Sequence, residues 1–207
     1  MKFFDLFKSV DKPDIEKNAY INNVPKQFRK EIIEIYGKYP ETPYMSPDRD
    51  FRFWIDNYVK LFGSVVPITN MKRLPNGLLA GHILMLWRIS FDNFSNKTTI
   101  PTYFEYEYGV DGKKTIHELI TGNYIKISSV IDSISTLKKS GLTDILEKHN
   151  IKYLKSANKA RLIENIANNL DMSIIEKEVD VKKYELTNIG SATLNEYSII
   201  VEKHKNK

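Results

Sequence analysis

Apolar side chains recur at helical spacing through the first half of the chain. The clearest repeat lies between Asp50 and Phe62, where successive apolar positions are mostly three or four residues apart: Phe51, Trp54, Ile55, Tyr58, Val59 and Phe62. Residues at this spacing fall on one face of an α-helix. The repeat therefore predicts an amphipathic helix that buries this whole face.

Two further segments carry helical patterns. From Val24 to Tyr36 a proline suits the first helical position, and three apolar residues share a face: Phe28, Ile32 and Ile35. The segment from Leu78 to Phe91 is apolar nearly all round, which is typical of a helix at the centre of a core. We expect both helices in one N-terminal domain.

The segment from 103 to 127 gives mixed signals. Residues 103–108 alternate aromatic side chains with Glu105 and Glu107, which suits a half-buried strand or the start of a helix, with both glutamates facing solvent. Residues 113–121 follow a helical pattern that Gly122 is suited to end, and residues 124–127 look extended.

Residues 136–170 have the pattern of two short helices joined by an extended linker. The first predicted helix is capped by Ser140, ends at Asn150 in a left-handed conformation, and has one apolar face: Leu142, Ile145 and Leu146. Ser156 is the expected cap of the second helix. The predicted buried stripe of this second helix comprises Leu162, Ile163, Ile166, Ala167 and Leu170. The linker is expected to point two apolar side chains inward, those of Ile151 and Leu154.

Positive charge is concentrated in this same stretch. The whole chain carries a net charge of +5 and has a pI near 9.1. Between Thr136 and Leu170 there are seven basic and three acidic residues, so one-sixth of the chain holds four of the five excess positive charges. Such a local basic patch favours an acidic partner, although lysines on a small helix also serve to keep it solvated.

The start of the second predicted helix suits a phosphate group. A helix N-terminus presents unpaired N–H groups and the positive end of the helix dipole. Polar and basic residues cluster around it and at the start of the preceding helix. We therefore expect DNA contacts from Lys138, Lys139, Lys152, Lys155, Ser156, Asn158, Lys159 and Arg161.

The stretch resembles the SAP family of DNA-binding modules, which have a helix-extended-helix fold. The residues that carry the resemblance are Leu137, Leu142, Leu146, Ile151, Ser156, Lys159, Leu162, Ile163 and Ile166. Three residues depart from the family pattern. Ala157 replaces its usual glycine, Lys139 stands where an apolar residue or threonine is common, and Gly141 replaces a frequent glutamate. The resemblance implies that the module binds duplex DNA, with a preference for AT-rich sequence.

A second resemblance concerns the tail. The sequence YELTNIGSATLNEY, from Tyr184 to Tyr197, is similar to the ending of bacterial winged-helix regulators, in which a strand leads into a helix capped here by Thr187. The order of segments is also similar to proteins of phages and mobile elements in Gram-positive bacteria. If the middle of the chain were a helix-turn-helix, Lys113, Lys114 and His117 would lie at the DNA groove. The alternative is that Ile116, Leu119 and Ile120 simply pack that helix.

These patterns predict a mainly α protein with minor β, in four parts. Residues 1–23 form an N-terminal arm, 24–130 a helical domain of unknown role, 133–170 the SAP-like module, and 171–207 a strand-helix tail. The expected function is that of a non-enzymatic protein that contacts the phosphate backbone of duplex DNA.

Other chemistry finds little support in the sequence. The absence of cysteine excludes disulfides and thiolate metal sites and suits a reducing cytoplasm. The four histidines lack metal-ligand spacing, no phosphate-binding glycine loop is present, and Asp48 and Asp50 are best explained as helix-starting residues. We therefore expect no catalytic residues, no metal, no cofactor and no membrane partner.

Two competing functions remain open at this stage. The chain could be a protein-interaction factor, such as a phage inhibitor of a host machine, that binds a host protein or itself through the N-terminal domain. Apolar residues near the start of the chain could then dock on a partner subunit, or they could pack on the chain's own core: Phe3, Phe4, Leu6 and Phe7. The other possibility is a winged-helix-like transcriptional regulator.

Overall fold

The computed structural model describes residues 19–206. The predicted arm, with its four apolar residues near the start, lies outside this range except for its last five residues, which form the 3₁₀ turn η2 (Ala19–Asn23). The described chain forms two compact units. Unit 1 runs up to Leu84 and resumes over Ile100–His117, and unit 2 comprises Met85–Thr99 and Glu118–Lys207. The segment predicted as one helical domain, 24–130, contributes to both units.

Unit 1 is built from short helices and connecting loops. In chain order they are η3 (Lys26–Phe28), α1 (Arg29–Tyr36), α2 (Phe51–Phe53), the π-helix η4 (Trp54–Val59), α3 (Lys60–Phe62), η5 (Ile68–Met71), the start of α4 (Ala80–Ile89), α5 (Tyr103–Tyr106) and the start of α6 (Gly112–Thr121). Residues 103–106 are therefore helical, which decides the ambiguity of that segment.

The predicted amphipathic helix over 50–62 forms, but not as one uniform α-helix. Asp50 caps it by accepting a hydrogen bond from the Phe53 N–H at 2.9 Å, as expected of a helix-starting residue. A π-turn follows, in which the Lys60 N–H bonds to the Ile55 carbonyl five residues back. Phe51, Trp54 and Ile55 are buried, whereas Phe62 is 74% exposed. The prediction of one continuous buried face is therefore wrong for its second half.

A buried ion pair lies under this helix. Arg49 is almost completely buried, and Glu105 accepts hydrogen bonds from its Nε at 2.9 Å and from the Ser46 N–H at 2.8 Å. The Arg49 guanidinium also lies 4.6 Å from the ring centre of Trp54 and 4.4 Å from that of Tyr106. The expectation that Glu105 faces solvent is thus wrong, because its carboxylate neutralises a buried arginine.

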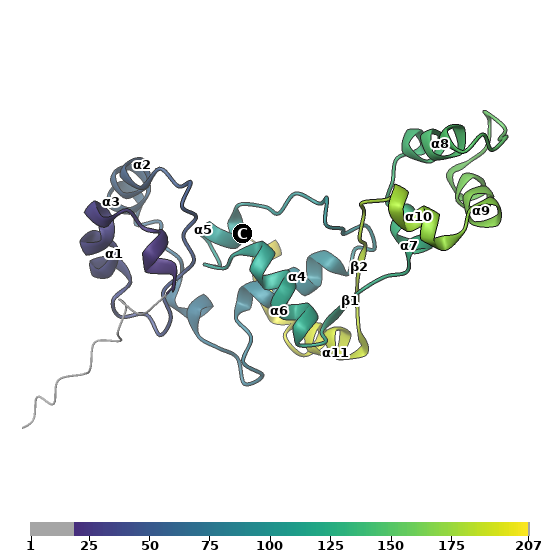
Figure 1. Cartoon of the computed structure of the whole chain (residues 1–207). Coiled ribbons are helices and arrows are strands. Elements are labelled where there is room, and N and C mark those ends of the chain that lie inside the picture. The colour runs from purple at the N-terminus through teal and green to yellow at the C-terminus, as the bar shows by residue number, and fades with distance from the viewer. Residues whose placement is uncertain (1–18, 207) are drawn as a thin grey trace, which may run out of the picture. The chain divides into compact units, whose positions relative to one another are not determined.

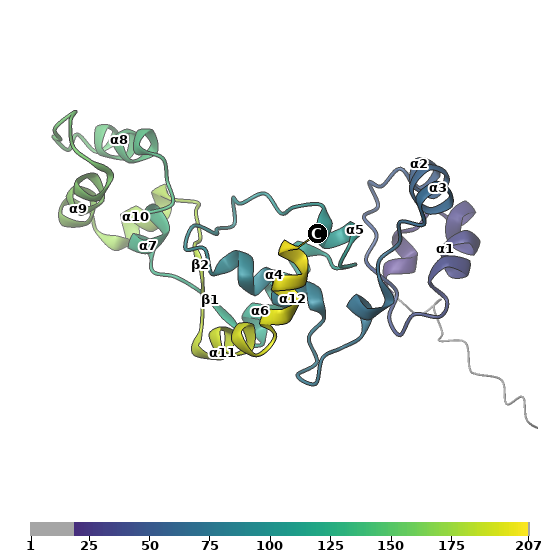
Figure 2. The same ribbon diagram turned by 180° about the vertical axis from the view of Figure 1, so that it is seen from behind.

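Unit 2 contains the two strands of the fold. β1 (Ile125–Ile127) pairs antiparallel with β2 (Tyr184–Leu186), with Ile125 opposite Leu186 and Ile127 opposite Tyr184. The predicted strand-helix tail is confirmed over β2, α11 (Asn188–Glu196) and the following α12 (Ser198–Lys205), which Figure 2 shows in succession. Thr187 caps α11 as predicted, since its hydroxyl accepts from the Gly190 N–H at 3.1 Å.

The helix before β1 ends differently from the prediction. Gly122 was expected as its left-handed final residue, but Asn123 takes that conformation, with φ of 58°. Asparagine tolerates this region because its short side chain can bond locally.

The end of α4 packs against α12. The Trp87 ring lies edge-on to the His204 ring, with ring centres 5.7 Å apart.

The chain between β1 and β2 forms a group of four short helices with its own core. They are α7 (Val130–Ile134), α8 (Lys139–Lys148), α9 (Lys159–Asn169) and α10 (Met172–Glu178) (Figure 1). One cluster of buried side chains joins all four: Ile134, Leu142, Ile145, Leu146, Ala157, Leu162, Ile166, Ile175 and Val179. We call residues 129–182 the inserted module, because the chain enters it directly from β1 and leaves it directly into β2.

The expected fold class, mainly α with minor β, is confirmed. Over residues 19–206 no helix has both the length and the apolar character needed to cross a bilayer.

Candidate nucleic-acid interface

The two predicted helices of the basic stretch are present, but neither begins at the serine predicted to cap it. Ser140 lies inside α8, whose N-cap residue, Lys138, makes no side-chain capping bond, and Ser156 precedes the true cap of α9. That cap is Asn158, whose side-chain oxygen accepts from the Arg161 N–H at 2.9 Å. Asn150 adopts the predicted left-handed conformation after α8, with φ of 55°.

The first turn of α9 retains N–H donors that have no hydrogen-bond partner within the helix. The first N–H groups of a helix have no carbonyl partner within it, and Asn158 satisfies that of Arg161 alone. The N–H groups of Lys159 and Ala160 therefore lie at the positive end of an eleven-residue helix, and both residues are exposed. This arrangement has the chemistry needed to hold a phosphate oxygen.

All eight residues predicted to contact DNA are exposed. Within the described chain, salt bridges are absent from the six cations predicted to contact DNA: Lys138, Lys139, Lys152, Lys155, Lys159 and Arg161. Lys148, at the opposite end of α8, is instead paired with Glu178 at 2.7 Å. From Lys148 to Ile163 the sequence contains no acidic residue. We call the six cations without salt bridges, Lys138, Lys139, Lys152, Lys155, Lys159 and Arg161, the basic rim.

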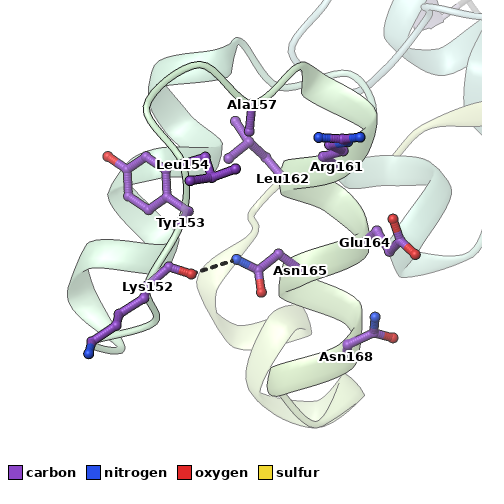
Figure 3. A pocket seen from close by; sticks show the side chains of 9 residues that line it. All are labelled: Lys152, Tyr153, Leu154, Ala157, Arg161, Leu162, Glu164, Asn165 and Asn168. Carbon is purple, nitrogen blue, oxygen red and sulfur yellow. Dashed lines mark hydrogen bonds between the residues drawn. The ribbon is translucent and has the colours of Figure 1, made fainter.

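Two hydrogen bonds fix the linker between α8 and α9. Lys139 Nζ, from the first turn of α8, donates to the Lys155 carbonyl at 3.3 Å. Asn165 Nδ2, from the middle of α9, donates to the Lys152 carbonyl at 3.0 Å (Figure 3). The first of these bonds brings the start of α8 next to the residues that precede α9, so that part of the basic rim from two helices comes together.

A groove of about 470 Å³ separates the linker from α9. Apolar side chains line it from Leu154, Ala157 and Leu162, and polar ones complete it: Lys152, Tyr153, Arg161, Glu164, Asn165 and Asn168. Figure 3 shows the ends of Lys152 and Arg161 pointing away from one another. The basic rim is therefore spread around the groove and the helix start, and Glu164 adds one acidic group beside it.

The linker buries different residues from those expected. Ala157 is buried, and its amide closes a turn by donating to the Leu154 carbonyl at 2.8 Å. Its φ lies outside the positive region, so alanine fits where the SAP pattern has glycine. Leu154, predicted to point inward, is 67% exposed, and the half-buried Tyr153 packs on the core in its place. In α9, Ala167 is likewise exposed although it was expected to be buried.

An acidic clamp closes the far end of the module. The Glu178 carboxylate lies 2.7 Å from Lys148 Nζ and 3.1 Å from His149 Nε2, so α10 is joined to the end of α8. The hydrogen bond from Lys148, followed by that from His149, holds the pKa of Glu178 below its ordinary value. Sequence reasoning missed this clamp because its partners are about thirty residues apart and carry no local motif.

The residues of the winged-helix alternative lie on the exposed side of α6. Lys114 Nζ donates to the Tyr20 hydroxyl at 3.0 Å, and its charge lies 4.9 Å from that ring. Lys113 and His117 are exposed, whereas Leu119 is fully buried. The alternative that α6 packs through its apolar residues is thus supported for Leu119, and Lys114 already has a partner within the protein.

The described residues contain no group of three or more histidine, aspartate and glutamate side chains placed to hold a metal ion. Comparison with protein-family models, with curated proteins and with solved structures gives no match for this chain. The SAP resemblance therefore stays a prediction that rests on the residues of the inserted module.

Proposed function

We propose that this protein binds the phosphate backbone of duplex DNA through the basic rim of its inserted module. The observation that carries the proposal is the set of exposed cations without salt bridges in the linker and at the starts of α8 and α9, together with the unpaired N–H groups at the start of α9. An unpaired cation costs little in water and gains from a phosphate, because binding releases the counterions condensed on DNA.

The arrangement favours contacts to phosphate over contacts to bases. Lysine side chains and helix N–H groups recognise the backbone, which carries no direct sequence information. With four to six such contacts, the binding constant falls steeply as salt rises, by a logarithmic slope of about 0.9 for each phosphate. We therefore expect modest sequence preference and strong salt dependence, with any preference for AT-rich duplex arising from its shape.

The test is a titration of a fluorescent duplex with the full chain, measured by anisotropy at several salt concentrations. The double variant Lys155→Gln, Lys159→Gln removes two contacts, so the logarithmic salt slope should become shallower by about 1.8. At 0.1 M salt its affinity should fall roughly 60-fold, since each contact contributes about eightfold under that condition.

A matched control removes the same charge elsewhere in the module. Lys177 and Lys182 are exposed and outside the basic rim, so the variant Lys177→Gln, Lys182→Gln should bind nearly as the parent does. Equal losses in both double variants would mean that net charge alone governs binding. Absence of binding by the parent at low salt would reject the proposed function.

A further inference from the structure

The linker between α8 and α9 presents an apolar side chain on a fixed backbone. Leu154 is 67% exposed, and it lies between the two carbonyls that accept bonds from Asn165 and Lys139, those of Lys152 and Lys155. A third bond, from the Ala157 amide to the Leu154 carbonyl itself, anchors the same turn in the core. The loop that carries Leu154 is thus held on both sides and at its own carbonyl.

A single exposed leucine on a surface needs no special explanation. Here, however, the chain orders a loop that carries an exposed leucine. Two cations of the basic rim lie close to it in the sequence, Lys152 two residues before it and Lys155 directly after it. Leu154 also lines the groove with Ala157 and Leu162, so an apolar surface continues behind it (Figure 3). A partner that meets this loop must therefore offer negative charge on both sides of an apolar contact.

Duplex DNA meets that requirement at a base step. The two strands supply phosphates on either side, and the stacked faces of neighbouring bases are apolar. Proteins that insert a leucine or similar side chain between bases unstack that step and bend the duplex, at a cost that the additional contacts offset. The cost is lowest where pairing is already weakened, as at a mismatch.

We propose that Leu154 inserts at a base step, so that the module prefers duplex DNA with a locally weakened stack over a fully paired duplex of the same sequence. This inference rests on the proposed function, because the basic rim must first hold the backbone. Leu154 determines the preference for deformable sites, and the cations determine the general affinity.

The experiment compares two fluorescent duplexes that differ by one central mismatch. For the full chain we expect the mismatched duplex to bind about tenfold more tightly at constant salt. The variant Leu154→Ala should bind both duplexes about equally and keep the parent's salt slope, because its cations are unchanged. Circular dichroism melting checks that the variant folds, as expected for an exposed position.

Two further variants separate the possible causes. Met172 of α10 is an exposed apolar residue of the same module outside the linker, 53% accessible, and Met172→Ala should keep the tenfold preference. The double variant Lys155→Gln, Lys159→Gln should bind both duplexes more weakly by the same factor, so that the ratio of the two affinities is unchanged.

The outcomes distinguish failure of the Leu154 insertion from failure of the proposed DNA binding. If the parent binds both duplexes equally, or if Leu154→Ala retains the preference, insertion is overturned while salt-dependent backbone binding stands. If the parent binds neither duplex at low salt, both proposals fall together.

Discussion

At the scale of single residues, two helical glycines meet opposite surroundings. A Cβ atom placed on Gly190 of α11 would lie 2.0 Å from the Tyr124 carbonyl oxygen, a backbone atom that cannot move aside. A Cβ placed on Gly141 of α8 would meet nothing closer than the Leu137 Cβ at 3.8 Å. Gly190 is therefore required where α11 approaches the chain before β1, whereas Gly141 only weakens its helix.

These surroundings predict changes of opposite sign. Gly190→Ala should destabilise the protein by about 3 kcal/mol, because the methyl group has no room and the backbone must shift. Gly141→Ala should stabilise it by about 1 kcal/mol, because alanine is the better helix former in open space. Urea unfolding followed by circular dichroism measures both. Similar effects for the two alanines would contradict the close approach of α11 to Tyr124.

Residue identity predicted some helix ends and not others. Thr187 was identified correctly from the strand-helix ending that the tail resembles, and Asn150 because it is the residue suited to a left-handed conformation at the end of its helix. Ser156 and Asn158 are both good caps two residues apart, and local preference cannot separate them. The burial of Ala157 in the core settles the matter, because it places the turn before Asn158. Such a tertiary contact is invisible in a local pattern.

At the scale of elements, the π-turn of η4 explains why a regular apolar repeat is only half buried. A turn closed by an i→i+5 bond takes up one residue more than an α-turn, so side chains beyond it are rotated relative to those before it. Phe51 and Trp54 precede the shift and are buried, and Phe62 follows it and is exposed. A sequence pattern assumes one constant period and cannot foresee this change.

The Glu178 clamp between α8 and α10 leads to a prediction about pH. Since the pKa of Glu178 is lowered in the folded state, its stabilisation is present above the ordinary carboxyl range, near pH 4.5, and is lost as pH falls through the lowered value. Glu178→Gln should therefore reduce the melting temperature at pH 7, and the difference from the parent should become smaller as the pH is lowered to 3. Melting curves across this range measure it.

A neighbouring residue supplies the control for this experiment. Glu176 lies on the same helix, is exposed, and makes no salt bridge within residues 19–206. Glu176→Gln should leave the melting temperature nearly unchanged at both pH values. A Glu178→Gln deficit that is as large at pH 3 as at pH 7 would show that the side chain acts through packing instead of charge.

At the scale of the whole molecule, the folded module that contains the basic stretch extends beyond the residues that the sequence pattern identified. The pattern over 136–170 identified α8 and α9, but three further residues complete the same core: Ile134 of α7, Ile175 of α10, and Val179 directly after α10. The strands β1 and β2 were each expected as extended segments. Their pairing was not foreseen, because it joins residues about sixty positions apart and no local period encodes such a contact.

This arrangement predicts that the inserted module and the hairpin that carries it can be separated. The Ser128 N–H bonds to the Lys183 carbonyl at 2.9 Å, which is the geometry of a residue pair that flanks a tight turn. Replacing residues 129–182 by Asn-Gly, a preferred two-residue hairpin turn, should leave a chain that unfolds cooperatively but no longer binds DNA. Circular dichroism melting and the anisotropy titration measure the two properties.

Two excised fragments of different length test which residues make up the folded module. A fragment of residues 129–182 keeps all members of the module's core and should fold and bind duplex alone, whereas a fragment of residues 133–170 lacks Ile175 and Val179 and should remain unfolded. Loss of two such buried aliphatic residues removes several kcal/mol, roughly 2–5 for each, which exceeds what a module this small can spare. Folding of the shorter fragment would show that the SAP-like signature is itself the domain, and binding by the chain without the module would place the DNA contacts elsewhere.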